Sequence, residues 1–224
     1  MVSDSLEQSV QAHKDFFIPL TLSLPKIDVD KLNNGIIKNL KQKHALSDRL
    51  WFNTATSTGD PLEDTRQHAN KFLDQFNLEA ETMGIFIVNA NTYDWNIHSD
   101  SARLETRLNF YELTTSPGIV RWFPDTTDGY EEIHKNLDGN DFIDYTWPWV
   151  VEFKQQHRDW SKIPLPIWST ATSCSSALVR TDLPHHVIQG DGLRITVTCK
   201  VVDKTTKSTR NTWERLCNLL AKEE

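Results

Sequence analysis

The chain has 224 residues, which suits one hydrophobic core, and we expect a single domain over residues 1–224. Its 31 acidic residues outnumber its 24 basic ones, giving a net charge of −7, and no basic run occurs, so nucleic acid is not an expected partner. The cysteine spacing excludes a disulfide framework and a thiolate zinc site, and no signal pattern or membrane-length apolar run occurs, so we expect a cytoplasmic protein with no membrane partner.

Residues 1–82 predict an extended segment and two helices that brace the remainder of the fold. Pro19 and Pro25 in FFIPLTLSLP discourage a helix and permit an edge strand. Apolar residues recur at helical spacing over 28–43, and a second helix is predicted after Pro61. The buried stripe expected of this second helix consists of Ala69, Phe72, Leu73 and Phe76.

Residues 83–202 predict a succession of short strands, which is typical of an antiparallel barrel or sandwich. These strands are apolar or alternating segments bounded by Gly, Pro and Asp, over 84–90, 95–98, 103–113, 118–123, 165–171, 174–182, 185–189 and 193–203. Between them, 124–141 is acidic and turn-rich, and 142–153 predicts one or two short strands. Residues 203–224 predict a C-terminal helix, with an apolar stripe of Trp213, Leu216, Leu219 and Leu220.

Two of the predicted strands alternate polar and apolar residues, so each has one polar and one apolar face. The faces of the earlier strand consist of Arg107, Asn109 and Tyr111 on one side and Leu108 and Phe110 on the other. The polar face of the later strand consists of Arg194, Thr196 and Thr198. We expect the polar faces to serve chemistry and the apolar faces to serve packing.

A His-x-Asp pair, His98 and Asp100, directly precedes the earlier strand. Residues i and i+2 of an extended segment point the same way, so both side chains can bind one ion. Two imidazoles and one carboxylate on one face of an octahedron hold Fe(II) and leave positions open for reactants. The third ligand is expected from the adjacent residues His185 and His186. Only one of these neighbours can face the site in a strand, and we prefer His185.

Two arginines follow these candidate ligands at the same interval. Arg107 lies nine residues after His98, and Arg194 lies nine residues after His185. An arginine inside a barrel needs an anion, because a buried charge must be compensated. A guanidinium matches a carboxylate through two parallel hydrogen bonds, and the hydroxyl of Thr196 can add a third. An Fe(II) site beside two arginines therefore suits a dicarboxylate that also chelates the metal.

The order of these motifs resembles that of the Fe(II)/2-oxoglutarate-dependent dioxygenases, which carry H-x-D…H followed by R-x-S/T. The resemblance implies a mainly β fold with flanking helices, in which residues 83–202 form a double-stranded β-helix (jelly-roll or cupin-like) barrel. The implied catalytic and metal-binding residues are His98, Asp100 and His185. The implied 2-oxoglutarate-binding residues are Arg194, Arg107, Thr196 and Asn109.

Within this superfamily, W-x-x-H with an arginine nine residues after the histidine, followed by leucine, is similar to the aspartyl/asparaginyl β-hydroxylase branch. Here these residues are Trp95, His98, Arg107 and Leu108. That branch has glycine where Asp100 stands, so this chain keeps the full triad of the wider superfamily. The resemblance implies hydroxylation of an unactivated C–H bond with O₂, coupled to decarboxylation of 2-oxoglutarate to succinate. The implied substrate is an amino-acid side chain, free or in a peptide or protein.

Two other interpretations fit the same residues. One is a non-catalytic barrel that keeps the fold as a binding or structural module, since fold does not fix function. The other is a different cupin-type metalloenzyme, although such sites usually have more histidines in the first motif and need no arginine after the last ligand. Asn109 and Tyr111 either line the pocket or bond to each other. Trp147, Trp149 and Trp160 either wall a substrate pocket or fill the core.

Overall fold

The structure is a computed structural model that describes residues 15–25, 62–89, 97, 100, 105–113, 118–124, 131–137, 140–146, 165–188 and 193–220. Within these ranges only the backbone is described for 87–89, 112–113, 131–137, 140–146, 193–195 and 219. The helix predicted over 28–43, the ligand candidate His98 and the tryptophans at 147, 149 and 160 lie outside the described residues.

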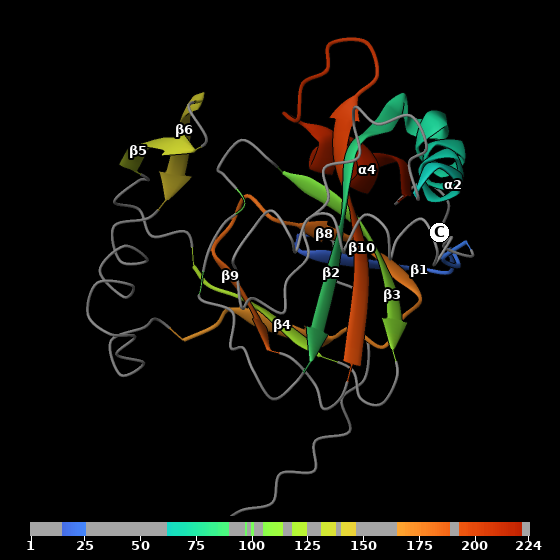
Figure 1. Cartoon of the computed structure of the whole chain (residues 1–224), viewed down its shortest axis with the longest axis horizontal. Helices are drawn as coiled ribbons and strands as arrows, with labels where there is room; N and C mark the ends of the chain where they lie inside the picture. The colour runs from blue at the N-terminus through green and yellow to red at the C-terminus, as the bar shows by residue number, and fades with distance from the viewer. Residues whose placement is uncertain are drawn as a thin grey trace, which may run out of the picture.

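The described chain is mainly β, with helices near both ends of the strand series (Figure 1). The helical elements are α2 (Glu63–Leu73), the short 3-10 helix η1 (Asp74–Phe76) and α4 (Thr212–Leu220). The strands are β1 (Phe17–Leu20), β2 (Leu78–Asn89), β3 (Thr106–Leu113), β4 (Ile119–Trp122), β5 (Glu131–Leu137), β6 (Asn140–Thr146), β7 (Trp168–Ala171), β8 (Ser176–Arg180), β9 (His185–Ile188) and β10 (Leu193–Asp203). Neither α2 nor α4 has the length and apolar run that a membrane crossing requires.

The main body consists of two antiparallel sheets, with strand orders β1-β8-β3-β10-β2 and β7-β4-β9. The chain passes repeatedly between them, since β8 belongs to the larger sheet, β9 to the smaller and β10 to the larger again. Residues from both sheets share one buried cluster, in which Tyr111 and Val179 of the larger sheet meet Val120 and Trp122 of the smaller. This arrangement is the double-stranded β-helix predicted from the sequence.

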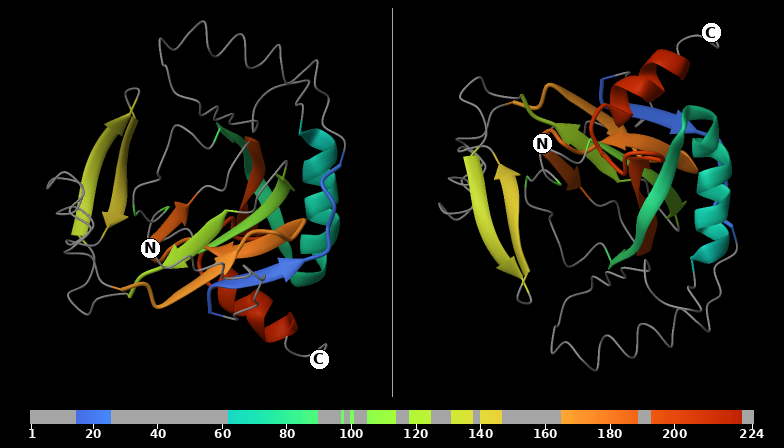
Figure 2. Two further views of the ribbon diagram at one scale, coloured as in Figure 1. Left: turned by 90° about the horizontal axis from the view of Figure 1, so that it is seen from below. Right: turned by 90° about the horizontal axis from the view of Figure 1, so that it is seen from above.

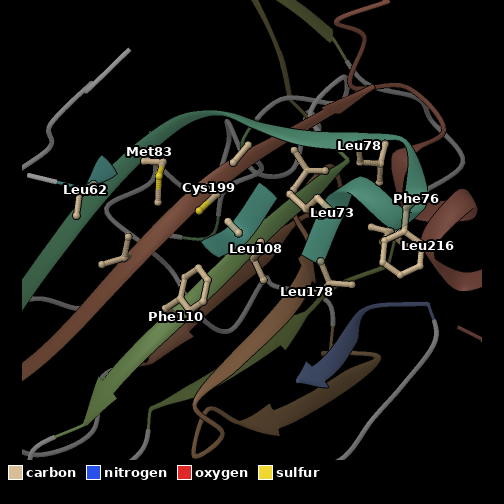
Figure 3. Packing of buried hydrophobic residues seen from close by; sticks show 14 of the residues in the cluster. Leu62, Leu73, Phe76, Leu78, Met83, Leu108, Phe110, Leu178, Cys199 and Leu216 are labelled. Atoms are coloured by element: carbon tan, nitrogen blue, oxygen red, sulfur yellow. The ribbon is translucent and has the colours of Figure 1, made fainter. Parts of the chain in front are cut away.

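The outer face of the larger sheet is covered by α2 and α4, as Figure 2 shows from two further directions. Leu108 and Phe110 of β3, Leu73 of α2 and Leu216 of α4 belong to one buried cluster, which Figure 3 shows at close range. The stripe predicted for α2 is confirmed, because Ala69, Leu73 and Phe76 are buried and Phe72 packs against them. The terminal helix is confirmed as well, since Trp213 and Leu216 are buried and Leu220 packs beside them.

Two predictions about strand positions need comment. The edge strand permitted by Pro19 is confirmed as β1, which pairs with β8 and, among the described strands, lies at the end of the larger sheet. The description of 124–141 as turn-rich is wrong in part, because β5 occupies Glu131–Leu137 and pairs with β6 as a hairpin. The two residues between the paired Leu137 and Asn140 are Asp138 and Gly139, a dipeptide that favours two-residue hairpin loops and that signals this turn.

Candidate functional site

A row of polar side chains runs along the inner face of the larger sheet, on β3 and β10. Tyr111 is in register with Thr196, and Asn109 is in register with Thr198, so these pairs lie on the same face. Tyr111, Thr196 and Thr198 are all less than one-tenth exposed. Tyr111 also belongs to the cluster between the two sheets, which fixes this face as the inner one. The predicted alternation of β3 is therefore confirmed, and we call Arg107, Asn109, Tyr111, Thr196 and Thr198 the inner polar row.

Asn109 stands in the middle of the inner polar row. Its Nδ2 donates a hydrogen bond to the hydroxyl of Tyr111 at 3.3 Å, which bears out one of the two roles weighed for this residue. Its Oδ1 is buried and accepts no hydrogen bond from any described residue. A buried acceptor without a donor costs free energy, so this position suits a bound molecule or water that donates to it.

Asp100 lies beside Arg107, at one end of the inner polar row. The Arg107 Nε donates to Asp100 Oδ2 at 2.9 Å, and the two side chains are 13% and 24% exposed. The backbone of Asp100 is also held, because its N–H donates to the carbonyl of Thr181 at 2.9 Å. Asp100 is therefore attached to the larger sheet through its side chain and to the chain after β8 through its backbone.

His185 begins β9 in the smaller sheet, four residues after Thr181. It is 4% exposed and in register with Trp122, a member of the cluster between the sheets, so it lies on the inner side. His186 is in register with Arg121 instead. Neighbouring residues of a strand face opposite sides, so only one of the two histidines faces the inner side, and it is His185, the residue preferred above. Its role as a ligand remains a prediction.

The imidazole of His185 has a defined tautomer. Its Nδ1 lies 2.9 Å from the carbonyl oxygen of Leu183. A carbonyl oxygen only accepts, so Nδ1 carries the proton, and the lone pair of the neutral ring is on Nε2. Metal-binding histidines commonly donate their other N–H to a carbonyl or carboxylate in this way. The sequence gives no signal for this contact, because its acceptor is a main-chain oxygen that every residue has.

An ion pair flanks the same turn. The Nε and Nη2 of Arg180 donate to the two carboxylate oxygens of Asp182 at 2.8 and 3.2 Å. Burial raises the pKa of Asp182, and the hydrogen bond and charge of Arg180 oppose that rise. Sequence reasoning gave Asp182 no role, and its contribution is to brace the turn that connects Thr181 to His185.

The structure places the predicted residues at different levels of detail. It joins Asp100 to Arg107 and ties Asp100 to the turn that leads into His185. For Arg194 it gives the backbone only, in register with Leu113 of β3. Because His98 is outside the described residues, the predicted triad is not complete there, and no three potential metal-binding side chains come together in the part of the chain that is described.

Comparison with known proteins gives matches at the level of structure alone. No protein-family model and no curated protein matches the sequence. Solved structures with a similar chain course include EvdMO1 (TM-score 0.43, 12% identity, 84% of this chain and 47% of that chain). AviO1 from Streptomyces viridochromogenes Tue57 has a TM-score of 0.41 at 14% identity, covering 85% of this chain and 91% of that chain.

A third solved structure is the Kdo hydroxylase KdoO, a non-heme Fe(II) alphaketoglutarate dependent dioxygenase in complex with succinate and Fe(III). Its TM-score is 0.44 at 16% identity, covering 93% of this chain and 87% of that chain. The chain thus spans about half the length of EvdMO1 and most of the length of the other two proteins. The function proposed below rests on the residues of this chain.

Proposed function

We propose that the protein is an Fe(II)- and 2-oxoglutarate-dependent oxygenase that hydroxylates an unactivated C–H bond. The observation that carries the proposal is the inner polar row, which begins at the Asp100–Arg107 pair. A barrel that served only as a packing module would fill its inner face with apolar side chains. Here the inner face holds, beside an apolar cluster, buried hydroxyl, phenol and amide groups together with a carboxylate and an imidazole.

The described donors fit a ferrous ion. His185 presents a lone pair on Nε2 because Nδ1 donates to Leu183, and Asp100 supplies a half-buried carboxylate that is already hydrogen-bonded. Imidazole and carboxylate together suit non-heme Fe(II). We propose that His98, two residues before Asp100, completes the triad.

For 2-oxoglutarate we propose Arg194 as the main anchor, with Thr196 and Asn109 beside it. Thr196 is buried on the inner face two residues after Arg194, and this spacing supports our proposal that Arg194 serves the same face. The guanidinium fork would pair with the distal carboxylate of the co-substrate. The co-substrate would then lie along the inner polar row, with its other end toward Asp100 and His185.

The chain's own residues would bind, orient and shield the reactants. Iron with 2-oxoglutarate and O₂ supplies the oxidising power for C–H hydroxylation, with succinate and CO₂ as by-products. Trp122 and Tyr111 exclude water from the inner face around the inner polar row. Thr181 and Leu183 hold Asp100 and His185 through their carbonyl oxygens. As substrate we propose an amino-acid side chain, free or in a peptide, following the W-x-x-H and Arg107 pattern.

The direct test is anaerobic titration of the protein with Fe(II) and 2-oxoglutarate, with the visible charge-transfer band of the chelate as the readout. The band should form in the wild type and be lost in His185→Ala and in Arg194→Ala. His186→Ala is the matched control, because it removes the neighbouring imidazole from the opposite side of the strand and should keep the band. Far-UV circular dichroism checks that each variant is folded.

Two results would contradict the proposal. A wild-type protein that forms no band would support a non-catalytic barrel. A band that survives both His185→Ala and Arg194→Ala would show that iron and 2-oxoglutarate bind elsewhere. Succinate release under air, measured with and without added amino acids and peptides, then tests catalysis and searches for the substrate.

A further inference from the structure

The structure gives Arg107 a partner that the sequence did not indicate. Sequence reasoning placed this arginine with Arg194 as a binder of 2-oxoglutarate. In the structure its Nε donates to Oδ2 of Asp100 at 2.9 Å, and the Arg107 side chain is only 13% exposed. We infer that Arg107 is a positioning residue, which orients the carboxylate of Asp100 toward the metal. The inference rests on the proposed function, since it assumes that Asp100 is a ligand.

The carboxylate of Asp100 is constrained from two directions. Its backbone N–H is bound to the carbonyl of Thr181, and its Oδ2 is bound to Arg107. The first contact fixes where the side chain starts, and the second fixes how the carboxylate is turned. A ligand held in this way loses less rotamer freedom when a metal binds, and partners of this kind typically raise metal affinity by about 10- to 100-fold.

The register of the sheet argues against a shared role for the two arginines. Arg107 is in register with Lys200 of β10, whereas Arg194 is in register with Leu113 of β3. Arg107 and Leu113 are six residues apart on one strand, which corresponds to about 20 Å at roughly 3.3 Å per residue. Two backbone positions so far apart do not present their guanidinium groups to the same carboxylate. Arg194 is therefore assigned to the distal carboxylate of the co-substrate, and Arg107 is assigned to Asp100 because its Nε contacts that carboxylate.

The charges around Arg107 agree with this division. Its cationic neighbour across the strand, Lys200, is itself paired with Glu81 at 2.6 Å. Within the described part of the chain, Arg107 is paired with the carboxylate of Asp100. A second carboxylate brought to the same guanidinium would lie next to Asp100, and two adjacent anions in a partly buried site repel each other.

The test compares metal binding with co-substrate binding in Arg107→Gln and Arg194→Gln. Co(II) is titrated anaerobically without 2-oxoglutarate and followed by its visible absorption, and 2-oxoglutarate is then titrated at saturating Co(II). Arg107→Gln should weaken Co(II) binding by about 10- to 100-fold and leave 2-oxoglutarate binding within about twofold of wild type. Arg194→Gln should show the opposite pattern. Arg107→Lys, which keeps the charge without the fork, should be intermediate for Co(II).

A double-mutant cycle separates positioning from a general structural role. If Arg107 acts through Asp100, the Asp100→Asn/Arg107→Gln double variant should bind Co(II) no more weakly than Asp100→Asn alone. Unchanged Co(II) affinity in Arg107→Gln, or a selective loss of 2-oxoglutarate binding in it, would overturn the inference. If Arg107→Gln does not fold, Arg107→Lys replaces it, and its Co(II) and 2-oxoglutarate affinities are compared with those of the wild type in the same way. A wild-type protein that binds neither Co(II) nor 2-oxoglutarate would instead refute the proposed function itself.

Discussion

Trp122 should be one of the most sensitive positions for stability, because its ring joins the two sheets. It is fully buried, and its centroid lies 5.4 Å from that of Trp168 and 6.2 Å from that of Phe17. Its Nε1 donates to the carbonyl of Arg180 at 2.9 Å. Trp122→Phe keeps an aromatic ring at this position but removes both the hydrogen-bond donor and the volume of the five-membered ring.

The expected cost has two parts. Loss of the donor from a buried carbonyl costs about 1–3 kcal/mol. The smaller ring leaves a cavity and loses apolar contacts, which adds about 1–2 kcal/mol. We therefore expect the free energy of unfolding to fall by about 2–4 kcal/mol in Trp122→Phe, after allowing for partial relaxation around the site.

Urea unfolding at pH 7, followed by far-UV circular dichroism and extrapolated linearly, measures this change. Leu165→Ala is the matched control, since that side chain is 86% exposed, and it should change the free energy by less than about 0.5 kcal/mol. A loss below about 1 kcal/mol in Trp122→Phe, with an unchanged m-value, would show that the sheets do not meet around this ring.

Three further outcomes are expected. The pKa of Asp203 is lowered, mainly by a hydrogen bond from the backbone N–H of Thr206 and next by one from the side chain of Arg215. Its stabilisation is thus fully present above about pH 4 and declines in acid, and the gap in urea midpoint between wild type and Asp203→Asn should be wide at pH 7 and narrower at pH 2. Burial raises the pKa of Cys199 to about 12, so iodoacetamide at pH 8 should label it only after unfolding, and mass mapping that finds rapid native labelling would contradict this. Thr106 and Thr212 share a buried hydrogen bond of 2.8 Å, so either valine variant should cost about 1–2 kcal/mol in urea unfolding, and strictly additive losses in the double variant would contradict the pairing.

The parts of the fold that could be predicted are those in which burial of one face makes apolar residues recur at strand or helix spacing. β3 separates the inner polar row from an outer apolar face, so alternation locates both the strand and its faces. The apolar stripe of α2 could be predicted for the same reason, because one side of the helix packs on the sheet. Strand β5 is not predicted because its sequence is polar, whereas β6 overlaps the segment 142–153, for which one or two short strands are predicted.

The sequence predicts which residues belong to the candidate site, and that membership remains a prediction, but it does not predict the contacts among the described ones. Which neighbour of the His185–His186 pair faces inward follows from pairing with β4, which no period in the sequence specifies. The His185 imidazole contacts the carbonyl of Leu183, and a main-chain contact of this kind cannot be predicted from residue type. The contact between Asp100 and Arg107 could not be read from their spacing, which assigned these two residues to different ligands.

The tie between Asp100 and Thr181 has a consequence for how such a protein changes over generations. Both atoms of that contact belong to the main chain, so any side chain of suitable size at position 181 preserves it. Residue 181 can therefore change by mutation while the two segments stay in place. Divergent homologues of this barrel would then keep the contact between these two segments even where the sequence around it is no longer similar.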